Sequence, residues 1–142
     1  MTLAETTPMN GGPDFKVVLG PDLGALATMR REATERLGAH GLTPETVDAV
    51  LLVLSELGAN AIQRTQRRAS VLVRVWLGDT TVIAEVENVG SPFDDRPAHA
   101  EQQVDSDSEG GRGLVIVRAL SSEVTMKHHD GRCIVRAVVP FR

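Results

Sequence analysis

The spacing of hydrophobic residues predicts a long helix in the first half of the chain. Between residues 44 and 67, valine, leucine and alanine recur at the three- and four-residue intervals of one face of an α-helix. These residues are Val47, Val50, Leu51, Leu54, Leu57 and Ala61. The preceding Thr43-Pro44-Glu45 offers a hydroxyl cap, a proline for the first turn and an early carboxylate, so we expect the helix to begin there.

Two other segments have a helical pattern. The first runs from Asp22 to about Leu37, and it is followed by Gly38 and Gly41, which are residues that commonly end helices. The second is the segment 112–121, with the sequence RGLVIVRALS.

Five short segments instead favour β-strands, because they are rich in β-branched residues or alternate between apolar and polar positions. They are residues 15–19, 70–77, 81–87, 123–129 and 132–139. Gly78-Asp79-Thr80 and Asp130-Gly131 fit the tight turns of two hairpins. Helices and strand pairs are grouped rather than strictly alternating, so we expect an α/β two-layer sandwich of the α+β class. Its sheet would be antiparallel or mixed, with three helices over one face.

The length of 142 residues is that of one domain. We expect residues 1–13 to form a disordered tail and residues 14–142 to form the domain. Residues 88–111 are polar and lack periodicity, and a loop of this length inside a compact domain is usually functional.

Composition narrows the classes of function. The net charge of −4, the 3% of aromatic residues and the lack of tyrosine argue against direct nucleic-acid binding. The single cysteine, Cys133, excludes an internal disulfide, and we expect it to be a small core residue. His128 and His129 point to opposite faces of a strand, so they do not share a metal ion. No signal segment or apolar membrane span is found, so we expect a cytoplasmic protein.

Two polar residues of the long predicted helix are candidates for a binding site. Glu56 and Asn60 are spaced i, i+4 and fall together on the side opposite Leu54, the centre of the apolar stripe. Leu52 and Val53 flank them, so a carboxylate and an amide lie among apolar residues, as in the wall of a cleft. A solvated helix face with two polar residues fits the pattern equally well.

Gly110, Gly111 and Gly113 surround the start of the predicted helix 112–121. Glycines let a backbone approach a ligand closely, and the free N–H groups and dipole of a helix start attract an anion. The segment is not a P-loop, since no Lys-Ser/Thr follows, and it is not a dinucleotide fingerprint, since no strand leads into it. A flexible hinge that caps an ordinary helix is the alternative interpretation.

In their order along the chain, SELGANAIQRT, VENVGSPF, the long loop and EGGRGLVIVRAL resemble the ATP-binding domain of GHKL (Bergerat-fold) proteins such as gyrase, histidine kinases and MutL. The resemblance extends from about residue 14 to 140 and is closest to small bacterial anti-sigma factors with serine protein kinase activity. It implies a GHKL ATP-binding fold, ATP and Mg²⁺ as cofactors, and a sigma factor and an anti-anti-sigma protein as partners. Phosphorylation of the anti-anti-sigma partner on Ser would be the enzymatic activity.

The resemblance also implies roles for individual residues. Glu56 is similar to the general base that activates a water or a substrate serine hydroxyl. Asn60 resembles the residue whose side-chain oxygen holds Mg²⁺, and Gly90 matches the glycine of the Asp-x-Gly box. The phosphate cradle would consist of Gly111, Gly113 and the backbone to Leu114, with a charge contact from Arg112 and with residues 88–109 as the lid.

Asn88 departs from the family pattern, which has Asp in that position of the box. Asparagine still accepts a hydrogen bond from adenine, but its NH₂ replaces the second acceptor of the carboxylate. An NH₂ left without a partner costs about 1–3 kcal/mol. Pro92 replaces the second glycine of a fuller Asp-x-Gly-x-Gly box. We therefore expect weak ATP binding.

Two alternatives to a working kinase stay open. The first is a non-catalytic protein-binding module of the same fold with a degenerate ATP pocket. The second, a detached histidine-kinase catalytic domain, is less expected because no helical hairpin with a phosphorylatable histidine precedes the domain.

The resemblance to the small anti-sigma factors further implies a homodimer. The first predicted helix carries Leu23, Leu26 and Met29, which we expect to be exposed near the N-terminal tail. The dimer would use this end of the sheet.

Overall fold

The computed structural model describes residues 12–20, 23–64, 70–89, 111–129 and 132–141, and within these ranges it contains five strands and three helices. The strands are β1 (Phe15–Leu19), β2 (Ser70–Leu77), β3 (Thr81–Val89), β4 (Glu123–His129) and β5 (Arg132–Pro140), and the helices are α2 (Ala25–Ala39), α3 (Pro44–Arg64) and α5 (Gly111–Leu120). Among the described helices, none has the length and hydrophobicity needed to cross a membrane. Residues 1–11 of the predicted tail, residues 90–110 of the predicted loop 88–111 and Asp130-Gly131 lie outside the described residues.

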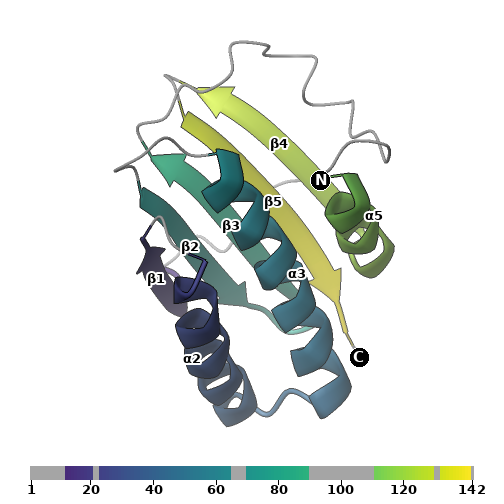
Figure 1. The fold of residues 1–142 in the computed structure, drawn as a ribbon. Coiled ribbons are helices and arrows are strands. Elements are labelled where there is room, and N and C mark those ends of the chain that lie inside the picture. Colours follow the sequence, from purple (N-terminus) through teal and green to yellow (C-terminus); the bar gives the residue numbers. More distant parts are fainter. Residues whose placement is uncertain (1–11, 21–22, 65–69, 90–110, 130–131, 142) are drawn as a thin grey trace.

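The described strands form one antiparallel sheet in the order β1-β2-β3-β5-β4. In Figure 1 the described helices all cover the same face of the sheet, with α3 between α2 and α5. The predicted two-layer α/β sandwich is confirmed, and of the two sheet types expected the antiparallel one is found. β3 lies in the middle of the sheet, between β2 and β5.

Residues alternate between the two faces of the sheet along each strand. Val73 lies opposite Val17 and Val86 in the neighbouring strands, and this row is part of the core under the helices or packs against it. We call this side the inner face. The next residue of β2, Arg74, lies opposite Glu85 of β3, and this pair points away from the helices, on the outer face.

The apolar stripe of α3 fills the middle of the core, as its spacing predicts. Val50 and Leu54 are both 0% exposed and Leu57 is 2% exposed. The helix also begins where expected. Pro44 is its first residue, and the N–H of Thr46 donates a hydrogen bond of 3.2 Å to Oγ1 of Thr43, the arrangement of a hydroxyl cap.

α2 differs from the prediction in its limits. It runs from Ala25 to Ala39 rather than over residues 22–37, and Gly38, expected to end the helix, lies inside it. The chain turns away from the helix at Gly41, whose φ of 85° is the left-handed conformation that glycine adopts without strain. The next N–H, that of Leu42, donates back to the carbonyl of Leu37 over 3.5 Å.

The expectation that Met29 is exposed is wrong. Its side chain is 0% exposed, because it lies on the same face of α2 as the buried Ala33 and Leu37, at helical intervals of four residues. Leu26 is partly buried and packs against the core, whereas Leu23, which precedes the helix, is 51% exposed.

Two elements near the predicted site also extend beyond their expected limits. β3 continues to Val89, past the predicted end at residue 87, because Asn88 and Val89 pair with Val71 and Ser70 of β2. α5 begins at Gly111, one residue earlier than predicted. Cys133 is 9% exposed in β5, which confirms its assignment to the core.

Candidate functional site

Three segments that carry predicted site residues lie at one end of the sandwich: the end of α3, the end of β3 and the start of α5. α3 ends at Arg64, shortly before β2 begins at Ser70, and Ser70 pairs with Val89 at the end of β3. β4 ends beside Cys133, the cross-strand partner of Asn88, so β4 begins at the opposite end of the sheet. α5 ends just before β4 begins and therefore runs towards that opposite end. The start of α5 therefore lies at this end too, and Figure 1 shows the three segments towards the top of the view.

Glu56 and Asn60 lie one turn apart on the half of α3 nearer this end, and both residues are half-buried. The two apolar neighbours that were expected to surround them do not form one surface. Val53 is 0% exposed in the core, whereas Leu52 is 41% exposed. Consecutive helix residues are turned by about 100°, so one faces the sheet and the other faces solvent. The carboxylate and the amide thus lie at the margin between core and surface.

Asn88 is a buried polar residue of the inner face. It is 4% exposed and lies between Val71 of β2 and Cys133 of β5. A carboxamide offers an acceptor oxygen and two donor hydrogens, and buried groups of this kind are nearly always hydrogen-bonded. A flat ligand edge with a donor beside an acceptor, such as that of adenine, matches this pattern.

The start of α5 supplies backbone N–H groups at the same end. The first N–H groups of a helix have no intrahelical partner, and the helix dipole adds partial positive charge to them. Because α5 begins at Gly111, both Gly111 and Gly113 lie in its first turn. Leu114 is 7% exposed and belongs to the core, so it anchors this turn against the core. The side chain of Arg112 and the whole of Gly90 lie outside the described residues.

The sequence did not point to His128 as part of this region. His128 lies opposite Cys133, so the row on the inner face continues from Asn88 through Cys133 to His128. Both ring nitrogens of His128 are buried, and neither has a hydrogen-bond partner in the described part of the chain. The signal in the sequence was the position of His128 and Cys133 on either side of a tight turn, but the pairing register was needed to place them beside Asn88.

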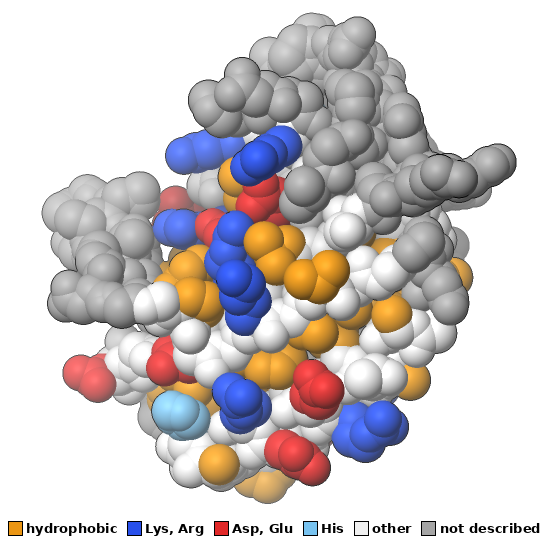
Figure 2. Space-filling model, turned by 90° about the vertical axis from the view of Figure 1, so that its left-hand side faces the viewer, with side chains coloured by type: hydrophobic (Ala, Val, Ile, Leu, Met, Phe, Trp, Pro, Cys, Tyr) orange, Lys and Arg blue, Asp and Glu red, His pale blue; other side chains and the backbone are white. Residues whose placement is uncertain are grey.

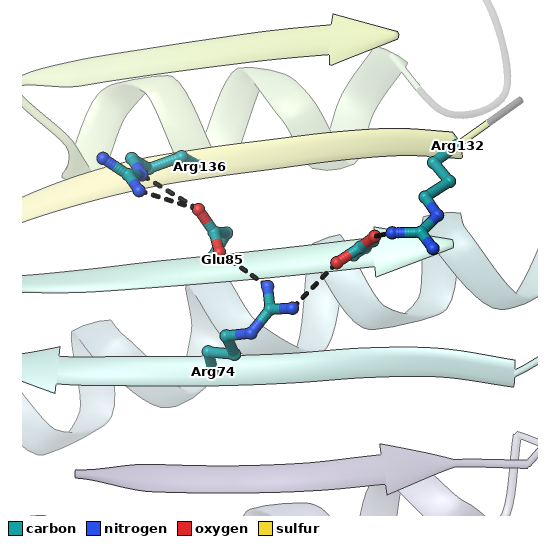
Figure 3. Close-up of polar contacts among 5 residues, drawn as sticks. Arg74, Glu85, Arg132 and Arg136 are labelled. Carbon is teal, nitrogen blue, oxygen red and sulfur yellow. Dashed lines mark hydrogen bonds and ion pairs between the residues drawn. The ribbon is translucent and has the colours of Figure 1, made fainter. Parts of the chain in front are cut away.

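A second group of polar residues that the sequence did not reveal lies behind Asn88 on the outer face. Glu85 and Glu87 of β3 are 7% and 2% exposed. Arg74 bridges them, with its Nη1 2.8 Å from Oε1 of Glu85 and its Nη2 2.9 Å from Oε1 of Glu87. From β5, Nη2 of Arg136 lies 2.9 Å from Oε2 of Glu85, and Nη1 of Arg132 lies 3.0 Å from Oε2 of Glu87 (Figure 3). Buried charges are stable only when they are paired in this way.

Comparison with solved structures agrees with this architecture. The structure of the RsbU and RsbW domains of Rv1364c from Mycobacterium tuberculosis matches with a TM-score of 0.63 and 20% identity, over 89% of this chain and 32% of that chain. This chain thus spans about a third of the length of that one. The catalytic domain of the histidine kinase ThkA matches with a TM-score of 0.57 and 15% identity, over 89% of this chain and 95% of that chain.

Sequence comparison gives the family. No significant match was found among curated protein sequences. The family model for the histidine kinase-like ATPase domain, however, matches residues 19–139, which include nearly all the described elements and all the candidate site residues. The chain therefore belongs to the histidine kinase-like ATPase domain family.

Proposed function

We propose that this chain is a nucleotide-binding regulator of the anti-sigma-factor type, with a GHKL site for ATP and Mg²⁺. It would bind a sigma factor, be released by an anti-anti-sigma protein and phosphorylate that protein on Ser. The observation that carries the proposal is the position of Asn88, buried on the inner face at the end of the sandwich where α5 begins. The family and the fold shared with an RsbU and RsbW domain structure support it.

The residues at this end suit the chemistry of the proposed cofactors. The carboxamide of Asn88 would contact the base, and the N–H groups of the first turn of α5, from Gly111 to Leu114, would bind phosphate. The side-chain oxygen of Asn60 is the hard oxygen donor that Mg²⁺ prefers. Bound ATP would supply the phosphoryl group, and Glu56 would accept the proton of the serine hydroxyl. Arg112 would add a charge contact to phosphate, and Gly90 would stand in the nucleotide box.

A second candidate function is favoured by the same residue. Asn88 has no negative charge, and its NH₂ donates where the carboxylate of the family would accept. A chain with this departure fits a non-catalytic protein-binding module that keeps the fold and binds its partners without phosphoryl transfer. The two candidates differ in whether ATP binds at a useful affinity.

The proposed regulator would act as a homodimer through the side of the molecule formed by β1 and α2. Val18 on the edge strand β1 is 60% exposed and Leu23 is 51% exposed. Figure 2 views this side and shows hydrophobic side chains across the middle of the surface, among basic and acidic ones. Met29, which sequence reasoning placed in this interface, is excluded by its burial, and Val18 takes its place.

Calorimetric titration of the pure protein with ATP tests the proposal, in the presence and absence of Mg²⁺. We expect Mg²⁺-dependent binding that Asn60→Ala weakens and that Glu56→Ala leaves unchanged, since a general base acts in the transition state. The natural chain should also bind a sigma factor of its own genome in a pull-down. Sigma-factor binding without any ATP binding would instead favour the non-catalytic module.

A further inference from the structure

Two consecutive residues of β3 lie on opposite faces of the sheet at the candidate site. Asn88 is on the inner face, in the row of Val71 and Cys133, and Glu87 is on the outer face, where it lies opposite Leu72 and Ile134. Asn88 is 4% exposed and Glu87 is 2% exposed. They share one peptide unit, so whatever fixes the backbone of Glu87 also limits the orientation of Asn88.

Glu87 is held from both neighbouring strands, but not by the residues directly opposite it. One carboxylate oxygen accepts from Arg74 of β2 over 2.9 Å, and the other accepts from Arg132 of β5 over 3.0 Å. Arg74 lies opposite Glu85, and Arg132 lies two residues before Ile134, so both reach Glu87 diagonally. These contacts (Figure 3) tie β2, β3 and β5 together at Glu87, the residue that precedes Asn88 in the chain.

Glu85 provides a comparison within the same strand. It is also buried and is also held from both sides, by Arg74 over 2.8 Å and by Arg136 over 2.9 Å. It lies opposite these two arginines and three residues from Asn88 along the chain. The two carboxylates therefore have the same chemistry, and they differ in their distance from Asn88.

We infer that Glu87, with Arg132 and Arg74, is a positioning residue for the base contact of Asn88. The paired carboxylate holds the last residues of β3 in register between β2 and β5, and it thereby aims the carboxamide of Asn88 at the base. The inference rests on the proposed nucleotide site and adds a determinant of base selectivity on the outer face, away from the ligand.

The test compares Glu87→Gln with the matched control Glu85→Gln. Both variants replace one buried carboxylate held by two arginines, so we expect similar shifts in Tm. In titrations with ATP and GTP, Glu87→Gln should lower the preference for ATP by about tenfold, whereas Glu85→Gln should leave it unchanged. In an Asn88→Ala background, Glu87→Gln should have no further effect on this preference, because the residue on which it acts is gone.

A second measurement reports on Asn88 without any ligand. In a ¹H–¹⁵N spectrum, the side-chain NH₂ signals of Asn88 are identified by their loss in Asn88→Asp. Glu87→Gln should shift or broaden these signals, and Glu85→Gln should leave them in place. Equal effects of both variants on the signals and on base preference would overturn the inference. A natural chain that binds no ATP would contradict the proposed function, and the NMR comparison would then decide the inference by itself.

Discussion

Arg74 of β2 and Glu85 of β3 are direct cross-strand partners, with Nη1 2.8 Å from Oε1. The same guanidinium reaches Glu87 with its other terminal nitrogen, so Arg74 is the arginine that the two buried carboxylates share. Removing one partner of a buried ion pair is strongly destabilising, and without Arg74 both Glu85 and Glu87 would stay buried with one arginine each instead of two.

Arg74→Met should therefore lower the free energy of unfolding by about 2–4 kcal/mol, measured by urea denaturation. Arg132→Met is the control, because Arg132 contacts Glu87 through a side chain that is 50% exposed. We expect a loss of about 1 kcal/mol or less for this variant. Equal losses of unfolding free energy in Arg74→Met and Arg132→Met would show that the contact of Arg74 with both carboxylates is unimportant for stability.

Val53→Ala and Leu52→Ala form a matched pair on α3. Val53 is 0% exposed and Leu52 is 41% exposed, although they are neighbours in sequence. Val53→Ala leaves a cavity in the core and should cost about 2 kcal/mol of unfolding free energy. Leu52→Ala should change it by less than about 0.5 kcal/mol. A larger loss from Leu52→Ala would place that side chain in an interface.

The elements were predictable from sequence because their signals are local. The stripe through Val50 and Leu54, the cap at Thr43 and the hairpin at Gly78 each depend on residues a few positions apart. The pairing of Glu85 with Arg136 and the approach of His128 to Asn88 depend on the order and register of the strands, which periodicity does not contain.

The burial of the candidate site residues also depends on tertiary contacts that the periodicity of the sequence does not contain. The stripe of α3 correctly placed Glu56 and Asn60 away from the centre of the core, but their half-burial depends on what packs beside α3. The residues at the N-terminal end of α2 do not by themselves show that Met29 belongs to the buried face of the helix. Ala33 and Leu37 complete the buried face to which it belongs.

Gly41→Ala should destabilise the protein although nothing lies within 4 Å of the added Cβ. The φ of 85° at Gly41 is unfavourable for any residue with a Cβ, and the expected loss is about 1–2 kcal/mol. Gly38→Ala is the control, because Gly38 lies inside α2 with the same open surroundings. There alanine should stabilise the helix by about 0.5–1 kcal/mol, as thermal unfolding would report.

Association through the side of β1 and α2 is tested by charges at its exposed hydrophobic residues. If the chain forms the proposed homodimer, the double variant Val18→Asp with Leu23→Asp should be a monomer in light scattering, because the interface would bury both carboxylates. Val115→Asp is the control, since Val115 is 47% exposed on α5, away from this side. A natural chain that is monomeric at high micromolar concentration would contradict the homodimer.

Asn88→Asp separates the two candidate functions. The substitution restores the carboxylate of the family box, and we expect ATP·Mg²⁺ to bind about tenfold to hundredfold more tightly, a gain of about 1–3 kcal/mol. Without nucleotide, Asn88→Asp should destabilise the protein. Asn88 is 4% exposed between Val71 and Cys133, so a carboxylate there is desolvated in the free protein and should lower its Tm.

Adding Glu56→Ala to Asn88→Asp should keep the tighter binding and abolish phosphoryl transfer, because the base acts on the transition state and not on bound ATP. Titration and a radiolabelled phosphate transfer assay measure the two effects separately. A natural chain that binds ATP at micromolar affinity, with no gain from Asn88→Asp, would make Asn88 itself a working adenine contact. The non-catalytic module would then lose its main support, because that candidate depends on the carboxamide of Asn88 weakening ATP binding.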